Sequence, residues 1–268
     1  MKSGQILILV LLVVVVALAI GLSVASRNII NLRTSTQTEQ SQRAFNAAEG
    51  GVENILPNLT SIGSANVGSS VGNCTVVSQS QNKTDCTVTL DNNIKANVNV
   101  LSAHEYERPV SLGDVAQIDL KGASGQVQID WAKPGENAPD GQAASLEVTQ
   151  IYGSSPYNAP RLYFQGGSGR NENGSFSTSP PCTVTSGYTK CVRIDIQPSP
   201  QILRIKPFWG STTVKVSGAN LPLQTYDITA TASTDIGVTR KVKVTRTVLP
   251  QLPAVFDYVL YSEGDIVK

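Results

Sequence analysis

The hydrophobic positions of this chain begin with one long uninterrupted run. Residues 6–25 are apolar except for Gly21 and Ser23, and no charged residue occurs from Ser3 to Ser26. A helix rises about 1.5 Å per residue, so this run spans about 30 Å, the thickness of the hydrocarbon core of a bilayer. Core helices of soluble proteins seldom stay apolar on every face over that length. The run therefore predicts a membrane-spanning helix.

Beyond residue 25 the pattern becomes that of an amphipathic helix, which is continuous with the apolar run. Small or apolar side chains recur every three or four positions, at Ile30, Thr34, Thr38, Ser41, Phe45, Ala48, Val52 and Ile55. This spacing is typical of one face of an α-helix. No proline precedes Pro57. We therefore expect a single helix from about Gln5 to Leu56, about 78 Å long and ended by Pro57.

From residue 58 onward the period changes to that of β-strands. Short alternating or β-branched runs are separated by Gly, Pro, Asn and Ser, which is typical of an antiparallel β domain. The expected strands are 74–77, 86–90, 96–101, 116–120, 127–131, 146–151, 161–164, 192–196, 203–205, 214–216, 226–232, 238–248 and 255–261.

The predicted fold class is thus α+β, with the second half of a long N-terminal helix packed on a mainly antiparallel β domain over residues 58–268. That domain is large enough for two β subdomains, with a soft boundary near residues 103–111. Residues 132–143 and 166–181 are loops by composition, since both are rich in Gly and Pro. The second loop is long for a compact domain, and a solvated linker is favoured over a contact with a partner.

The four cysteines form two local pairs in the sequence. Cys74 and Cys86, like Cys182 and Cys191, flank a short turn-rich segment between strand-like runs. Three pairings are possible, and we favour the two local ones because each closes a hairpin. Disulfides are expected if the domain lies outside the cytoplasm. The alternative is a zinc site, but the closely spaced pairs typical of structural zinc are absent from the sequence.

Composition argues against several classes of function. Lys and Arg number 21 against 20 Asp and Glu, so the chain lacks the basic excess of a dedicated nucleic-acid binder. His104 is the only histidine, and the sequence has none of the usual nucleophile-elbow, zinc-protease or phosphate-loop motifs. We therefore predict no enzymatic activity, no metal site and no cofactor.

Three smaller features have structural as well as functional interpretations. A basic cluster lies on one predicted strand, at Arg240, Lys241, Lys243 and Arg246. It suggests a weak polyanion site, but an edge strand protected by charge is the favoured interpretation. Trp131, Phe208 and Trp209 are expected in the core or on a sheet face. N-x-S/T triplets begin at Asn58, Asn73, Asn82 and Asn173, and glycosylation at them remains open.

The apolar N-terminus admits three kinds of segment. A lipoprotein signal needs a cysteine after the run, and none occurs before Cys74. A secretory signal would have a shorter run and a small-residue cleavage site, which residues 23–25 fit loosely. A retained anchor behind a very short leader best explains why the helical pattern continues past the run.

The retained anchor resembles a type IV pilin. Residues 1–4, MKSG, followed by Gln5 and the apolar run, look like a prepilin leader, which ends in Gly and is cut after it. Residues 44–49, AFNAAE, are similar to the stretch that closes the N-terminal helix of minor pilins and pseudopilins of the PilX N-terminal type. The resemblance covers about residues 1–56. Gln5 replaces the usual Phe or Met after the cut, and Leu9 replaces the Glu of most major pilins.

The resemblance implies a minor subunit, initiating or at the tip, of a type IV pilus or type II secretion pseudopilus. Prepilin peptidase would cut between Gly4 and Gln5, and the helix would anchor in the inner membrane and later enter the fibre core. It implies that helix packing involves Ile6, Leu9, Phe45, Ala48, Glu49 and Val52. The implied partners are other pilin subunits, a membrane assembly platform and the bilayer, with the β domain outside the cytoplasm. The alternative is a surface adhesive β domain on a single-pass anchor or a secretory signal, which does not polymerise.

Overall fold

The computed structural model describes residues 3–90, 94–168, 170, 182–218 and 220–250, with side chains from Val10 onward. The chain forms two compact units. The first consists of Met1–Gln79, Thr84–Asn99 and Thr229–Lys243, and the second of Ser80–Lys83, Val100–Ile228 and Val244–Lys268. The expected combination of a long helix with a mostly antiparallel β region is confirmed.

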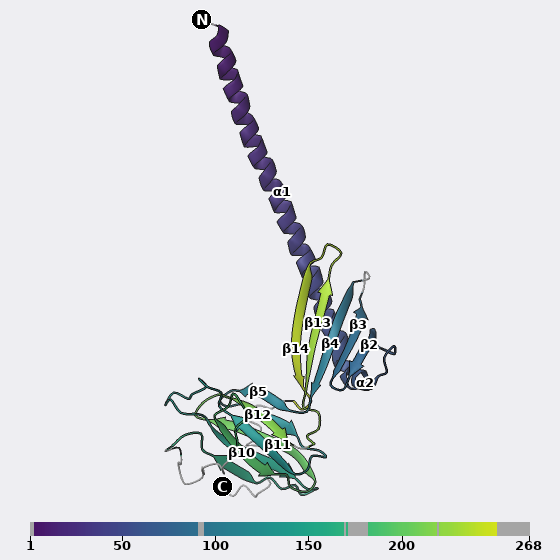
Figure 1. Cartoon of the computed structure of the whole chain (residues 1–268), viewed down its shortest axis with the longest axis vertical. Helices are drawn as coiled ribbons and strands as arrows, with labels where there is room; N and C mark the ends of the chain where they lie inside the picture. Colours follow the sequence, from purple (N-terminus) through teal and green to yellow (C-terminus); the bar gives the residue numbers. More distant parts are fainter. Residues whose placement is uncertain (1–2, 91–93, 169, 171–181, 219, 251–268) are drawn as a thin grey trace, which may run out of the picture. The chain divides into compact units, whose positions relative to one another are not determined.

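One helix dominates the first unit. Helix α1 runs without a break from Ser3 to Ile55, as the continuous helical pattern predicts (Figure 1). The expected stop at Pro57 is only partly right. A 3-10 turn, η1 (Leu56–Asn58), and a short helix, α2 (Leu59–Ser64), continue the helical path. Proline is tolerated there because it lies in the first turn of a new helical segment, whose N–H groups have no partner within the helix.

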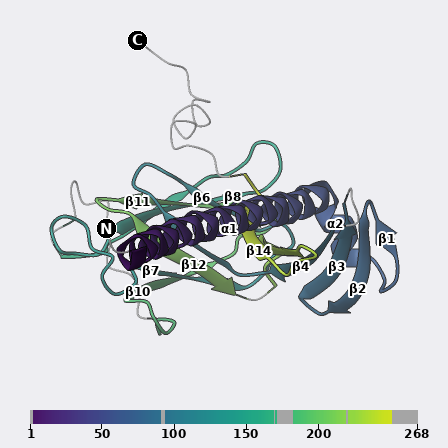
Figure 2. The same cartoon turned by 90° about the horizontal axis from the view of Figure 1, so that it is seen from above.

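The rear half of α1 and helix α2 lie beside a six-stranded sheet (Figures 1 and 2). Its strand order is β1-β2-β3-β4-β13-β14. The strands are β1 (Ser70–Val71), β2 (Cys74–Ser80), β3 (Lys83–Thr89), β4 (Lys95–Ala103), β13 (Thr225–Ser233) and β14 (Thr239–Thr247). The sheet joins strands that are far apart in the sequence, because β13 pairs next to β4.

Small side chains make the contact between helix and sheet. The buried residues of this part of α1 are Ala44, Ala47, Ala48, Gly51, Val52 and Ile55. They face the alternating buried positions of the strands, such as Val88 on β3 and Val98 on β4. Within the predicted stripe, Ala48, Val52 and Ile55 are buried, whereas the Phe45 side chain is 44% exposed. Ala44 and Ala48 are buried against the sheet because a close approach to a sheet leaves room only for small side chains.

Both disulfides have the predicted pairing. Cys74 of β2 is bonded to Cys86 of β3 across 5.7 Å between Cα atoms. Cys182 is bonded to Cys191 of β10 across 6.1 Å. Each closes a short loop, and a closed loop of about this size stabilises a fold by about 3 kcal/mol in the chain-entropy model.

The second unit contains two four-stranded sheets. One has the order β10-β7-β12-β5 and the other β6-β11-β8-β9. The strands are β5 (Tyr106–Val110), β6 (Ala116–Asp119), β7 (Gln126–Trp131), β8 (Ser145–Tyr152), β9 (Arg161–Phe164), β10 (Lys190–Asp195), β11 (Pro200–Phe208) and β12 (Thr212–Gly218). All the pairings within these two sheets are antiparallel.

A single hydrophobic core joins the two sheets of the second unit. Strands of both sheets contribute alternate residues to it, among them Ile129 of β7, Val214 of β12 and Leu203 of β11. Trp131 is fully buried in this core and donates a hydrogen bond from Nε1 to the carbonyl of Ala144 at 2.8 Å. This agrees with its expected place in the core. Trp209 and Phe208 are half-buried.

Two strands of the structure were not predicted from the sequence. One predicted strand lies outside the described residues. Strand β1 has two residues and no periodicity to detect. Strand β5 lies inside the stretch 103–111, where we expected a soft boundary, and its Tyr106 is fully buried. The division into the two units falls within β4, β13 and β14 and around the turn from β2 to β3. The strand predicted at 255–261 lies beyond the last described residue, and most of the loop 166–181 also lies outside the description.

Candidate functional site: the front half of helix α1

The front half of α1 is an exposed apolar rod. Every residue from Val10 to Glu39 is exposed within the described chain. Leu22 is 70% exposed and Leu32 is 68% exposed. The most apolar 18-residue window of the described helix has a mean hydropathy of 2.4, and none of it is buried. One helix is therefore long and apolar enough to cross a membrane.

This exposure has a large energetic cost in water. Burying one Val, Leu or Ile side chain is worth about 1.5–3 kcal/mol. Monomeric soluble proteins rarely leave continuous apolar surface of this extent uncovered. Two environments can cover it, namely the hydrocarbon of a bilayer and the apolar faces of other helices.

The polar residues that follow the apolar run satisfy their own hydrogen bonds. The hydroxyls of Thr34, Thr36 and Thr38 donate to backbone carbonyls four residues earlier, at 2.9–3.0 Å. A hydroxyl that donates to a carbonyl of its own helix has no unsatisfied hydrogen-bond donor. This part of α1 can therefore pack against a protein surface without the penalty of a buried unpaired hydroxyl.

The predicted leader cleavage site lies at the beginning of α1. Gly4 and Gln5 both fall within the helix that starts at Ser3. The side chains of Ile6 and Leu9, which we expected to take part in helix assembly, lie outside the described side chains. Cleavage between Gly4 and Gln5 stays a prediction.

The remaining residues predicted for helix packing differ in burial. Ala48 and Val52 are buried against the sheet of the same chain. Phe45 and Glu49 are exposed, and by the helical repeat they lie at one edge of the buried face. The rear half of α1 therefore packs on the sheet with one face and leaves an adjacent strip, including one aromatic ring, uncovered.

The basic cluster of β14 does not form one patch. Among the described strands β14 is an edge of its sheet. Arg240 points to the helix, where its Nε donates to the Ser41 hydroxyl at 2.8 Å. Lys241 and Lys243 lie on the opposite face of the strand, because side chains alternate along it. The arrangement fits an edge strand that is protected by charge better than it fits a polyanion site.

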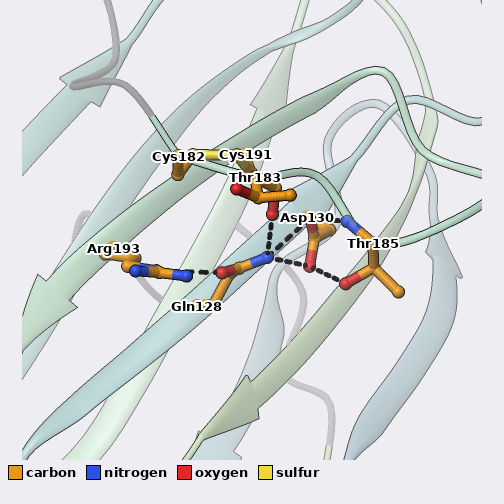
Figure 3. The surroundings of a disulfide bond; sticks show 7 residues. All are labelled: Gln128, Asp130, Cys182, Thr183, Thr185, Cys191 and Arg193. Atoms are coloured by element: carbon orange, nitrogen blue, oxygen red, sulfur yellow. Dashed lines mark hydrogen bonds between the residues drawn. A yellow bond between two sulfur atoms is a disulfide. The ribbon is translucent and has the colours of Figure 1, made fainter.

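In the second unit, a polar cluster fixes a disulfide-closed loop (Figure 3). The buried carboxylate of Asp130 on β7 accepts hydrogen bonds from the amide and the hydroxyl of Thr185, at 2.9 and 2.8 Å. Gln128 Nε2 donates to Asp130 and to the carbonyl of Thr183. Arg193 Nε donates to the Gln128 side-chain oxygen at 3.0 Å. The cluster holds the loop between Cys182 and Cys191 against the sheet.

A second carboxylate holds the loop that follows β7. Burial raises the pKa of Glu136, but hydrogen bonds from the hydroxyl and the amide of Thr213 and from the amide of Lys133 outweigh it and lower the pKa overall. Glu107 on β5 has a lowered pKa chiefly because Lys133 Nζ donates to it at 2.7 Å. Both carboxylates therefore hold the loop that follows β7 in the second unit.

His104 and the four cysteines each have a partner within the chain. His104 Nδ1 lies 2.9 Å from the carbonyl of Leu221. All four cysteines are in disulfides. Within the described part of the chain, no group of three His, Cys, Asp or Glu side chains could hold a metal ion.

Comparison with known families and curated proteins does not assign this chain to a family. A proposal for its function must therefore rest on its residues and their geometry. No family model matches the chain, and no curated protein matches it significantly.

Proposed function

We propose that this protein is a minor, initiating or tip subunit of a type IV pilus or type II secretion pseudopilus. It is anchored in the inner membrane by the front half of α1 and enters the fibre through the same helix. The single observation that carries the proposal is the change of environment along one unbroken helix. The side chains of residues 10–39 are exposed, whereas Ala44, Ala48 and Val52 are buried against the protein's own sheet.

A simple anchor has no need of this continuity. A membrane span normally needs about 20 residues, and α1 extends for 53. A rigid rod that projects from a folded unit can exchange lipid for neighbouring rods and keep its apolar surface covered in both states. Thr34, Thr36 and Thr38 lie between the two halves, and their hydroxyls donate to the backbone of the same helix. They can therefore move from water into a helix bundle without loss of hydrogen bonds.

The two disulfides support a location of the β region outside the cytoplasm. Stable disulfides form in oxidising compartments and are rare in the cytosol. With the β region outside, the residues before the span would face the cytoplasm, where a prepilin peptidase would find the bond between Gly4 and Gln5.

Leu9 favours a minor subunit over the main one. A carboxylate in hydrocarbon is costly unless it is paired, so a leucine at this position makes membrane residence easier and removes a charged docking partner. A subunit that is needed once per fibre can accept that loss.

The test is the mature N-terminus together with the presence of the protein in sheared fibres. The chain is expressed with a pilus assembly system, and its N-terminus is determined by mass spectrometry. A chain that begins at Gln5 and is recovered with fibres supports the proposal. The variant Gly4→Leu should keep Met1, remain in the membrane fraction and be absent from fibres, whereas the control Ser3→Ala should behave as the wild type.

Two outcomes would overturn the proposal. A mature chain that begins at Ser26 would indicate a secretory signal. A chain with Met1 intact that is never recovered with fibres would indicate a surface β domain on a single-pass anchor.

A further inference from the structure

Two arginines, Arg27 and Arg33, are the only charged residues within the stretch 3–38. Both are exposed, and within the described part of the chain neither takes part in a hydrogen bond or an ion pair. The next two charged residues along α1 differ, because Glu39 Oε1 and Arg43 Nε lie 3.5 Å apart. Arg27 and Arg33 are therefore two unpaired cations on the helix just beyond its apolar run.

The position of these two residues along the helix matches the headgroup layer of a bilayer. With residues 6–25 in the hydrocarbon core, the Cα atom of Arg27 lies about 3 Å beyond the core and that of Arg33 about 12 Å beyond it. A headgroup layer is about 5–7 Å thick on each side of the core. Side chains of a helix point back toward its N-terminus, so the guanidinium of Arg33 lies closer to the core than its Cα atom does. Both guanidinium groups can therefore reach the phosphates.

The two arginines point to different sides of the helix. They are six positions apart in the sequence, which at about 3.6 residues per turn places their side chains about 120° apart around the axis. A protein partner on one side of the helix would meet only one of them. Headgroups surround a helix that crosses a bilayer and can meet both. The arrangement therefore favours a lipid surface over a one-sided protein contact.

The large apolar side chains that lie between the arginines are also uncovered. Ile29 is 59% exposed, Ile30 is 58% exposed and Leu32 is 68% exposed. A mixture of apolar and basic side chains is typical of helical segments at the boundary between headgroups and acyl chains, where the apolar groups are buried and the basic ones meet anionic lipids. The contact between α1 and the bilayer thus continues past the apolar run to about Arg33.

The side of the membrane on which the arginines lie adds to this argument. With the β region outside the cytoplasm, as proposed above, both arginines are on the outer side of the span. Lys and Arg are usually scarce in the segments that border a span on that side. Anionic groups offset the cost of placing them there, and a guanidinium binds phosphate oxygens through paired hydrogen bonds.

We propose that Arg27 and Arg33 bind the headgroup phosphates of anionic phospholipids in the leaflet that faces the β region. The bound lipids hold α1 at one depth, because a shift along the membrane normal would move both guanidinium groups away from the phosphates. This inference rests on the membrane-anchoring half of the proposed function and does not depend on leader cleavage or on fibre assembly.

The experiment measures the lipid preference of the full chain in mixed vesicles of phosphatidylcholine and phosphatidylglycerol. Traces of spin-labelled lipid of either class report, by electron paramagnetic resonance, which headgroups lie next to the helix. The wild type should select phosphatidylglycerol at low salt, and the selection should weaken as salt is added. Arg27→Gln and Arg33→Gln should each lower the selection by up to about fivefold, which corresponds to about 1 kcal/mol per basic residue near the surface.

Arg43→Gln is the matched control, because it makes the same change at an exposed arginine of the same helix. Its Cα atom lies about 27 Å beyond residue 25, out of reach of the headgroups, so the selection should not change. The double variant Arg27→Lys/Arg33→Lys keeps both charges and should keep most of the selection.

Equal association of the two lipids with the wild type would overturn the proposal, as would selection that survives in Arg27→Gln/Arg33→Gln. Energy transfer between labelled chains that is lost in this double variant would also overturn it, because the arginines would then bind a second copy. Insertion without selection contradicts this inference alone. A wild-type chain that alkaline carbonate removes from the vesicles would contradict the anchor as well, and with it the proposed function.

Discussion

The backbone of α1 at Gly51 lies directly against Ala96 of β4. A Cβ atom at position 51 would be 2.8 Å from the Ala96 Cβ and 3.3 Å from a methyl group of Val98. Real Cβ contacts are essentially never this short, so glycine is what allows the helix to approach the sheet. The residue is a costly choice inside a helix, by about 1 kcal/mol relative to alanine, and its steric role explains its presence.

Replacement of this glycine should separate helix and sheet. Gly51→Val should lower the free energy of unfolding of the first unit by about 1–3 kcal/mol, the usual cost of overpacking a core. Thermal melting of the full chain in detergent measures the change. Gly63→Ala in α2 is the control, because no atom lies within 4 Å of its new methyl group. An equal melting temperature for Gly51→Val and wild type would contradict the role of this contact.

The membrane role of α1 predicts the effect of a charge in the middle of the apolar run. Val15 is 56% exposed in the isolated chain. An arginine at the centre of a spanning helix costs about 2.5–3.5 kcal/mol on insertion scales. Val15→Arg should therefore reduce the membrane-bound fraction in cell fractionation, whereas Asn28→Arg beyond the run should not. Full retention of Val15→Arg in the membrane fraction would argue against a span centred there.

Acid should destabilise the second unit through Glu136. Its pKa in the folded chain is below the ordinary value of a glutamate because Thr213 and the amide of Lys133 donate hydrogen bonds to the carboxylate, so the folded state favours the carboxylate. The resulting stability is present above about pH 4.5 and is lost as the pH falls through the folded-state pKa. Glu136→Gln should flatten the dependence of unfolding on pH between about pH 5 and 2, measured by urea titrations. A slope as steep as that of the wild type would mean that other carboxylates account for the effect.

The Asp130 cluster predicts local loosening of the disulfide-closed loop. Asp130→Ala leaves the amide of Thr185 without its acceptor, which costs about 1–3 kcal/mol for a buried donor. Amide exchange at residues 183–189 should become faster while exchange in the core strands changes little, as mass spectrometry of the full chain would show. Ser186→Ala, at an exposed position of the same loop, should change neither. Unaltered exchange in Asp130→Ala would mean that the disulfide alone orders the loop.

Much of the local structure could be predicted because it depends on neighbours in the sequence. The unbroken helix follows from a three-to-four-residue period without an internal proline, and alternation located most strands of both units. The pairing of Cys74 with Cys86 followed from a short turn between them. The exposure of Phe45 could not be predicted, since a stripe of apolar residues does not reveal that the sheet would come too close for a ring.

The sequence by itself determined the long helix, its apolar front half, the strands and the two disulfides, because each depends on interactions within a few residues or on one uniform solvent preference. Only the tertiary structure decided that β13 pairs beside β4, that Gly51 lies against Ala96, and that Phe45 is exposed while Ala48 is buried. These features depend on contacts between residues distant in the sequence, whose geometry is set by how closely the packed backbones approach one another.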